Sequence, residues 1–164
     1  MSQPTNTPSL EGAPGWSLLD VPDILVTEGT FLSGEPEGDR LRVRHFVAED
    51  GTTVIAKVWF GPRTEGPPGH VHGGAMAAIM DEIMGLACWH NQLVVVAANL
   101  SFDYRNMLPL RSETEVEARI IKVEDRKVHT KSVLRLPDGT VVTEGRGLFI
   151  DVKAKLLANH GRSE

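Results

Sequence analysis

One segment of this chain differs in composition from everything around it. Residues 72–90 read HGGAMAAIMDEIMGLACWH, in which alanine and methionine dominate and β-branched residues are scarce. Such a composition favours a helix. Apolar side chains cover most of its circumference, which is typical of a helix buried on nearly all sides. A chain with one buried helix needs other elements to surround it.

Alternating apolar and polar residues on both sides of the helix supply those elements. Before it, two alternating runs are joined by a turn at Asp50-Gly51, which predicts a β-hairpin. After it, further runs are joined by short turns, and short connections make neighbouring strands antiparallel. The predicted strands are residues 41–48, 54–60, 94–106, 114–120, 128–136 and 141–152. The sequence therefore predicts an α+β fold, with a single antiparallel β-sheet curved around one central α-helix.

The length of 164 residues suits one domain with its own core rather than two. We expect this domain to span residues 41–152, where the strands and the helix lie. Residues 1–40 are the expected N-terminal lead-in. Its first part holds three prolines and small polar residues without periodicity, and residues 16–31 are compatible with a short helix or an irregular cover over the core. Residues 153–164 are the expected C-terminal tail.

Charge and hydropathy argue against several classes of protein. The chain has 17 basic and 22 acidic residues and no basic run, which disfavours a nucleic-acid binder. Apolar stretches such as 75–80 and 93–98 are far shorter than the roughly 20 residues of a membrane span, so no membrane partner is expected. The first ten residues lack signal-peptide features, and the only cysteine, Cys88, has no partner in the chain. Both observations favour a cytoplasmic location.

The start of the predicted helix offers a site for negative charge. Pro67, Pro68 and Gly69 turn the chain just before it, and Gly73 and Gly74 open the helix with no side chain over its first N–H groups. Exposed N–H groups and the helix dipole make such an end a donor site for an anion. This end of the helix could therefore serve as an oxyanion hole.

An acidic pair, Asp81-Glu82, interrupts the otherwise apolar helix nine residues after His72. Charged side chains rarely lie in a buried helix without a partner or a task. We expect Asp81 to have a functional role in the site. We expect Glu82 to point elsewhere, as a solvated or paired residue. At ~100° per residue, Asp81, Gly85 and Cys88 share one stripe, so Gly85 leaves room beside the carboxylate for a substrate or a partner helix.

Gly73 and Asp81 are too far apart on one helix to act on one carbonyl group. Eight residues at ~1.5 Å each separate them by about 12 Å, whereas reacting atoms approach within roughly 3–3.5 Å. Two such helices packed antiparallel across a two-fold axis would bring Gly73 of one protomer opposite Asp81 of the other, twice. A site built on both residues therefore requires a homodimer and lies at its interface.

Together these motifs resemble a known family. The features are GHVHGG at residues 69–74, then Asp81-Glu82, Ala98-Asn99-Leu100 and Tyr104-Arg105. They resemble the hotdog-fold acyl-CoA thioesterases of the phenylacetic-acid-degradation (PaaI-like) type, over about residues 40–152. The resemblance implies the hotdog fold, in which a curved antiparallel sheet wraps a central helix. It also implies homodimers that often pair again into homotetramers.

The resemblance also implies roles for individual residues. The Gly73 N–H would polarise the carbonyl group of an acyl-CoA substrate beside Gly74, Asp81 would be the catalytic carboxylate, and His72 would support the loop. Asp81 could activate a water molecule as general base or attack the carbonyl directly as nucleophile. A thiolate leaves readily because the pKa of its thiol is about 8.5. Hydrolysis then needs no strong general acid, and no cofactor is expected.

The sequence departs from the family pattern on the strand after the helix. Many relatives have a threonine or serine there, hydrogen-bonded to the water or the carboxylate, and the matching position here is Ala97. On an extended strand Asn99 and Ser101 face the same side as Ala97, so either could supply the missing hydrogen bond. The alternative function is a non-catalytic hotdog module that binds acyl-CoA, its hydrogen-bonding partner lost at Ala97.

Other contacts to the substrate are less defined by the sequence. Asn106-Met107 replaces an Arg-Pro common in relatives, which leaves Arg105 as the candidate for the coenzyme A phosphates. The acyl group depends on the shape of a pocket that the sequence does not reveal. Its candidate lining residues are Met76, Met80, Met84, Leu86, Trp89 and Phe102.

The sequence also bears on three other chemistries. His70-x-His72 has the spacing of two metal ligands, as in cupins, but a cupin would continue through β structure to a glutamate, so no metal is expected. Cys88 and His90 diverge by about 200° on a helix, so we expect Cys88 in the core rather than as a nucleophile. A hotdog hydratase acting on enoyl-CoA would need a catalytic histidine motif that is not found.

Overall fold

The computed structural model describes residues 8–25, 31–32 and 38–155. Parts of the expected lead-in and tail therefore lie outside the described residues. The elements in chain order are β1 (Ser17–Leu18), the 3-10 helix η1 (Asp23–Leu25), β2 (Leu41–Val47), β3 (Val54–Phe60), the 3-10 helix η2 (Pro62–Thr64), α1 (Gly73–His90), β4 (Val95–Tyr104), β5 (Glu113–Glu124), β6 (Lys127–Arg135) and β7 (Val141–Asp151). In this part of the chain, no helix combines the length and apolar character that a bilayer crossing requires.

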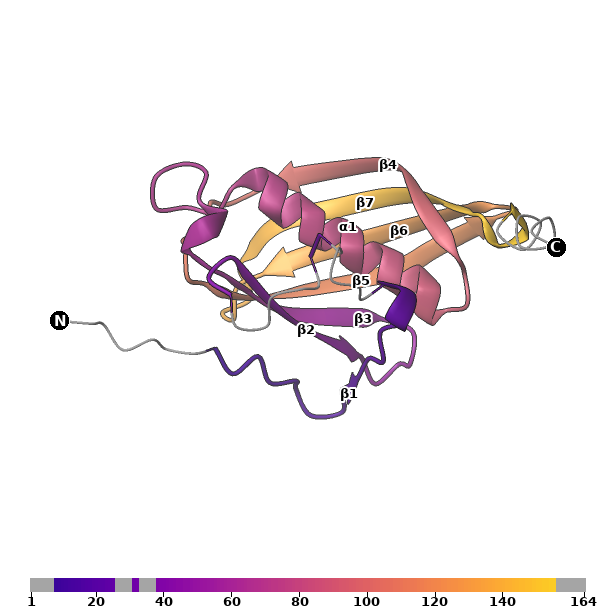
Figure 1. The fold of residues 1–164 in the computed structure, drawn as a ribbon, viewed down its shortest axis with the longest axis horizontal. Helices are drawn as coiled ribbons and strands as arrows, with labels where there is room; N and C mark the ends of the chain where they lie inside the picture. Colours follow the sequence, from indigo (N-terminus) through magenta and orange to yellow (C-terminus); the bar gives the residue numbers. More distant parts are fainter. Residues whose placement is uncertain (1–7, 26–30, 33–37, 156–164) are drawn as a thin grey trace.

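The strands form a single antiparallel sheet in the order β1-β2-β3-β5-β6-β7-β4. Figure 1 shows this sheet curving around α1, which lies across its inner face. The predicted α+β layout is confirmed, and the β2–β3 hairpin turns at the predicted Asp50-Gly51, where Gly51 has a φ of 73°. The strand expected at residues 94–106 is shorter, since β4 ends at Tyr104.

The core lies between α1 and the sheet. Ile79, Met80, Ile83 and Met84 of α1 have no exposed surface, and they pack in one cluster with buried side chains of the sheet strands. Each such side chain contributes about 1.5–3 kcal/mol by burial. Because both ends of α1 are held to this core, the positions of its first turn and of Asp81 are set by the packing.

The helix begins and ends at residues that satisfy its free backbone groups. His72 is the N-cap, and Asn91 at the other end donates from its side-chain amide to the carbonyl oxygen of Ala87 at 2.8 Å. Gln92 then takes a φ of 67°, which turns the chain toward β4. The predicted helix is thereby confirmed almost to the residue.

The segment before β2 is an irregular cover rather than a helix. Its two-residue strand β1 pairs with the end of β2, and the single turn η1 follows. Leu19, Val21 and Leu25 pack against the core cluster from this side. Of the two structures that the sequence left open for residues 16–31, the described part therefore matches the irregular cover.

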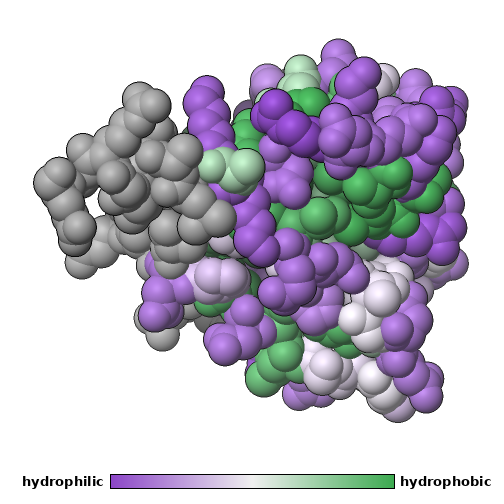
Figure 2. All heavy atoms as spheres, turned by 90° about the vertical axis from the view of Figure 1, so that its right-hand side faces the viewer, coloured by the Kyte–Doolittle hydropathy of each residue, from purple (hydrophilic) through white to green (hydrophobic). Residues whose placement is uncertain are grey.

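Strand β4 forms one edge of the sheet and is largely exposed. Only Val95 is buried along its ten residues, and Val96 and Tyr104 expose 54% and 49% of their surface. Figure 2 views the end of the molecule where α1 and β5 end and β4 begins, and apolar surface there lies among hydrophilic side chains. A long edge strand without a neighbour offers unpaired backbone groups to another chain.

Candidate functional site

The first turn of α1 leaves one backbone donor free. The N–H of Gly74 donates to Nδ1 of His72 at 2.8 Å, and the N–H groups of Ala75 and Met76 donate to the His72 carbonyl oxygen. The N–H of Gly73 has no acceptor among the described residues. The Gly73 N–H is therefore available to a ligand at the positive end of the helix dipole, whereas that of Gly74 is engaged.

The hydrogen bond from Gly74 also determines the tautomer of His72. A ring nitrogen that accepts a hydrogen bond carries no proton, so in neutral His72 the proton is on Nε2. The His72 side chain is exposed, and its Nε2–H is a second donor at the start of α1. The family resemblance implies that His72 supports the loop, and the structure adds the N-cap and this exposed donor.

Tyr104, at the end of β4, packs on the same turn of the helix. Its hydroxyl group donates to the carbonyl oxygen of Gly73 at 2.8 Å. A Cβ atom on Gly73 would lie 3.3 Å from Cζ of Tyr104, so the ring occupies the space that a side chain would need. The sequence offered Tyr104 only as part of a motif and contained no signal for this contact.

The loop before α1 is held by its own hydrogen bonds. The N–H of His72 donates to the carbonyl oxygen of Thr64 at 2.7 Å, and the side chain of Glu65 accepts the N–H of Gly69 at 2.8 Å. At Gly66 a Cβ atom would come within 2.8 Å of the His72 Cα, so only glycine allows this approach. The start of α1 is therefore a fixed structure rather than a loose junction.

The histidine pair of the loop does not form a metal centre in this structure. Nδ1 of His70 lies 2.9 Å from the carbonyl oxygen of Pro68, and Nδ1 of His72 is the N-cap acceptor. The described part of the chain contains no group of three His, Cys, Asp or Glu side chains that could hold a metal ion. The two histidines instead shape the loop and the first turn of α1.

Asp81 lies in a hollow of about 360 Å³ between α1, β4 and the N-terminal cover. Its side chain is half-buried and accepts no hydrogen bond from the described residues, and desolvation raises its pKa above the ordinary value of 3.8. A raised pKa makes a carboxylate a stronger base. Gly85 and Ala97 line the same hollow, so the expected free space beside Asp81 is present.

Glu82 lies in this hollow as well, so the expectation that it points elsewhere is wrong. Burial raises the pKa of its carboxyl group, and the neighbouring charge of Asp81 raises it further. Residues adjacent on a helix point about 100° apart, yet the hollow is wide enough to include both side chains. The hollow therefore contains two carboxyl groups whose pKa values are both raised.

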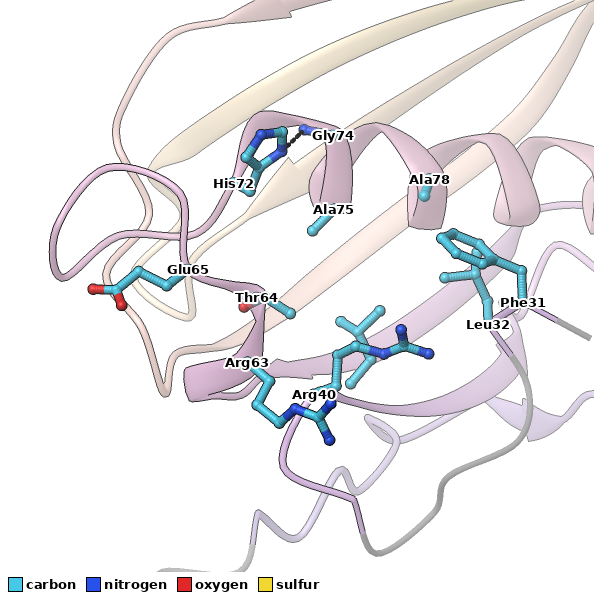
Figure 3. Close-up of a pocket in the computed structure, with 11 residues that line it drawn as sticks. Phe31, Leu32, Arg40, Arg63, Thr64, Glu65, His72, Gly74, Ala75 and Ala78 are labelled. Atoms are coloured by element: carbon cyan, nitrogen blue, oxygen red, sulfur yellow. Dashed lines mark hydrogen bonds between the residues drawn. The ribbon is translucent and has the colours of Figure 1, made fainter.

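The helix start opens into a different hollow, of about 440 Å³, lined by His72, Gly74 and Ala75 among others (Figure 3). Asp81 does not line it, and neither Gly73 nor Gly74 lines the Asp81 hollow. Phe31 contributes to both. This separation agrees with the spacing of about 12 Å expected from the helix rise.

Asn99 and Ser101 do not face the Asp81 hollow, so the expectation that they share a face with Ala97 is wrong. A β-bulge between Ala97 and Asn99 adds one residue to β4. Ala97 pairs with the buried Phe149 on the inner face, whereas Ser101 pairs with the exposed Arg146 on the outer face. A bulge of one residue reverses the alternation of side chains along a strand.

Among the other candidates, Leu86 and Trp89 line the Asp81 hollow, whereas Arg105 and Cys88 line neither hollow. Arg105 forms an ion pair with Glu144 at 2.9 Å on the surface and does not approach Asp81. Cys88 is fully buried, and burial raises the pKa of its thiol to about 12, which confirms it as a core residue. His90 instead lies 2.9 Å from the carbonyl oxygen of Gly51.

Comparison with known sequences identifies related proteins. Residues 68–143 match the family model described as "Thioesterase superfamily". Acyl-coenzyme A thioesterase THEM4 from Xenopus laevis is 38% identical over 91 residues, which cover 55% of this chain and 41% of that protein. THEM4 from Rattus norvegicus is 37% identical over 121 residues, which cover 73% and 52%. The chain thus spans about half the length of the curated relatives it matches.

Comparison with solved structures confirms the hotdog fold. The crystal structure of a thioesterase superfamily protein superposes with a TM-score of 0.64 at 33% identity, covering 67% of this chain and 54% of that chain. The PaaI protein of E. coli from the phenylacetic acid degradation operon has a TM-score of 0.60 at 14% identity, with 68% and 78% covered. A hypothetical thioesterase from Streptococcus pneumoniae TIGR4, solved with coenzyme A, has a TM-score of 0.59 at 16% identity, with 61% and 78% covered. The last two show a shared fold alone.

Proposed function

This chain belongs to the thioesterase superfamily, and on that premise we propose that it hydrolyses acyl-coenzyme A thioesters. The observation that carries the proposal is the free N–H of Gly73 at a rigid helix start, which His72 caps through Nδ1. A free backbone donor at the positive end of a helix dipole suits the oxyanion of acyl transfer. The names of the relatives and the coenzyme A bound to one structural neighbour point to the same substrate class.

In the proposed mechanism, the thioester carbonyl oxygen accepts a hydrogen bond from the Gly73 N–H, while His72 holds the first turn of α1 in place through its hydrogen bond with Gly74. Asp81 takes a proton from a water molecule whose oxygen attacks the carbonyl carbon, and the C–S bond then breaks. The thiolate leaves without a general acid, because the pKa of its thiol is about 8.5. Direct attack by Asp81 is the second route and gives a mixed anhydride, which water then hydrolyses.

We propose that the site combines two subunits, because Gly73 and Asp81 line no common hollow within one chain. Edge strand β4 supports this assembly, since its exposed backbone groups and Val96 would be covered by a second copy. The half-exposed stripe of Ala78, Asp81 and Gly85 on α1 allows close approach of a partner helix. Pairing of such dimers into tetramers stays a prediction.

A pair of substitutions at Gly73 tests the oxyanion donor. Gly73→Pro removes the N–H, and proline is tolerated at the first position of a helix. The backbone of His72, with φ of −64° and ψ of 134°, suits a residue before proline. Gly73→Ala adds the same Cβ atom against Tyr104 but keeps the N–H. We expect Gly73→Pro to lower kcat by about 10²–10³ relative to Gly73→Ala, as for loss of one oxyanion donor.

A complementation experiment tests the two-subunit site. Gly73→Pro and Asp81→Asn each leave an inactive homodimer, but a mixed dimer contains one site with both native residues. Random pairing makes about half of the dimers mixed, so co-expression should restore about one quarter of wild-type activity. If each site were formed within one chain, co-expression of the two variants would restore no activity. Glu117→Gln, on β5 away from both hollows, is the control for a lost carboxylate.

The second candidate function is a binding module without turnover. It is favoured by Ala97, since no hydroxyl side chain lines the described part of the Asp81 hollow to orient a water molecule. In that case the protein would bind coenzyme A esters stoichiometrically, and a panel of acyl-CoA substrates would release no thiol. Turnover that Asp81→Asn abolishes, with the oligomer intact, would exclude this alternative.

A further inference from the structure

The hollow at the start of α1 contains two arginine side chains that the proposed chemistry does not use. Arg40 immediately precedes β2, and Arg63 belongs to η2. Figure 3 shows both on the side of the hollow opposite the helix, with the end of Arg40 extending toward Phe31 and Leu32 and the end of Arg63 pointing away from α1. In a chain with an excess of acidic residues, the two side chains are a local concentration of positive charge in the hollow that Gly74 also lines.

Backbone hydrogen bonds tie the two arginine-bearing segments together. The N–H of Gly61 donates to the carbonyl oxygen of Arg40 at 2.8 Å, and the N–H of Arg63 donates to that of Asp39 at 3.2 Å. Gly61 has no room for a side chain, because a Cβ atom there would overlap the Asp39 carbonyl oxygen. The bases of the two side chains are therefore held at a fixed separation, which reduces the entropy lost when both bind one group.

Neither guanidinium group is saturated by acidic partners. Arg63 lies 3.6 Å from Asp39 in a pair whose side chains are 67% and 60% exposed, and such pairs contribute little. Arg40 lies over the ring of Phe31 at 5.8 Å, and none of the described carboxylates pairs with it. Glu65, the acidic residue in the lining, accepts the N–H of Gly69 instead. Both arginines can therefore donate to an incoming anion.

The hollow also has an apolar part, beside the polar Thr64, Glu65 and His72. Its apolar lining consists of Phe31 and Leu32 from the segment before β2, Leu41 of β2, and Ala75 and Ala78 of α1. A ligand that fits this arrangement has an apolar segment next to the helix start and an anionic group beyond it. Free phosphate or a small carboxylate would satisfy only one of the two features.

We propose that this hollow binds an anionic group of the thioester substrate, with Arg40 and Arg63 as the specificity-determining residues. The inference rests on the proposed function, because the reacting carbonyl is placed at the Gly73 N–H. The anion is a carboxylate at the far end of the acyl chain or a phosphate of the coenzyme A arm. The shared chemistry is recognition of an anion tethered to the thioester by an apolar linker.

Four thioesters distinguish the two sources. They are adipoyl-CoA, hexanoyl-CoA and the N-acetylcysteamine thioesters of the same two acids, which lack phosphates. The variant is Arg40→Gln with Arg63→Gln, and the matched control is Arg119→Gln, an exposed arginine on β5 that lines neither hollow. Loss of one charge-assisted hydrogen bond corresponds to at least about tenfold in kcat/KM.

An acyl carboxylate is the bound anion if the kcat/KM of the double variant falls at least about tenfold with both adipoyl esters and is unchanged with both hexanoyl esters. A coenzyme A phosphate is the bound anion if kcat/KM falls with both CoA esters and is unchanged with both N-acetylcysteamine esters. The proposal is overturned if all four behave as in Arg119→Gln. An equal loss with all four also overturns it, since that would show a general effect on the fold.

A binding measurement keeps this proposal separate from the hydrolytic one. Isothermal titration of the inactive Asp81→Asn variant with adipoyl-CoA should give a Kd that rises at least about tenfold when both arginines are also replaced, and that rises with added NaCl. If the wild-type protein hydrolyses no thioester but this shift in Kd is seen, anion recognition stands and hydrolysis fails. An unchanged Kd overturns the role of the arginines whatever the activity.

Discussion

The hydroxyl group of Tyr104 and the Nδ1 of His72 bind opposite ends of the same peptide group. Tyr104 donates to the carbonyl oxygen of Gly73, and the N–H of Gly74, in the same peptide unit, donates to His72; both distances are 2.8 Å. Hydrogen bonds in series polarise one another. Tyr104 therefore supports the orientation of His72 and the geometry of the first turn of α1, although it lies at the end of β4.

Tyr104→Phe tests this relationship. The substitution keeps the ring against Gly73 and removes only the hydroxyl group, so we expect the free energy of unfolding to fall by about 1 kcal/mol. The kcat should fall by several fold because His72 loses support. Thr114→Val removes a comparable hydrogen bond, from a side-chain hydroxyl group to the carbonyl oxygen of Val58, and Thr114 lines neither hollow. That control should lose stability but keep its kcat, and equal kcat values for both variants would contradict the positioning role.

His72→Ser separates capping from catalysis. Serine is a good N-cap, so the free energy of unfolding should stay within about 0.5 kcal/mol of wild type, whereas His72→Ala should cost about 1 kcal/mol. His72→Ala also loses the acceptor that holds the first turn of α1, so we expect its kcat to fall several fold, whereas His72→Ser should keep a kcat close to that of the wild type. Chemical denaturation and steady-state kinetics on the three proteins measure the two effects. A kcat for His72→Ser as low as that for His72→Ala would show that the imidazole acts beyond the cap.

His45 on β2 predicts a pH dependence of stability. Burial lowers the pKa of its imidazole from 6.5 to about 4, and its Nε2 has no hydrogen-bond partner in the described structure. Between pH 6.5 and 4, His45 binds a proton in the unfolded chain but stays neutral in the folded chain. The free energy of unfolding therefore falls by up to about 3 kcal/mol as the pH falls from 6.5 to 4. Above pH 6.5 the imidazole is neutral in both states, so His45 causes no loss of stability there.

Denaturation of wild type and His45→Leu at several pH values between 4 and 7.5 measures this contribution. The difference between the two proteins is the relevant quantity, because Asp81 and Glu82, whose pKa values are raised, shift stability in the opposite direction. As the pH falls through this range, the free energy of unfolding of the His45→Leu variant should rise steadily relative to that of the wild type. Parallel curves would show that His45 does not titrate differently in the folded state.

Ser132→Ala should be neutral or stabilising, although Ser132 is buried under α1. Its hydroxyl group has no hydrogen-bond partner in the described structure, so removing it leaves no other group unsatisfied. Thr114→Val is the matched contrast, since the Thr114 hydroxyl donates to the Val58 carbonyl oxygen at 3.1 Å. We expect that variant to lose about 1 kcal/mol. A larger loss for Ser132→Ala would reveal a partner for its hydroxyl group.

Errors in the predicted site have a common physical origin. Strict alternation along a strand places Asn99 and Ser101 on the same side as Ala97, but the bulge that reverses their direction exists only because β4 pairs with β7 in that register. Similarly, the angle between Asp81 and Glu82 on a helix is predictable, whereas the width of the hollow beside them depends on β4 and the N-terminal cover. Both errors concern how one element meets another.

The sequence by itself determined the properties that arise within about ten neighbouring residues. The buried helix, its start at the two glycines, the strand alternation and the spacing of Gly73 from Asp81 follow from side-chain periodicity and from the fixed rise of a helix. Only the tertiary structure decided which groups meet there. Tyr104 reaches Gly73 across 31 residues, and Arg40 and Arg63 join one hollow through backbone bonds between separate segments. Such contacts depend on the packing of the sheet around α1, and no local pattern encodes them.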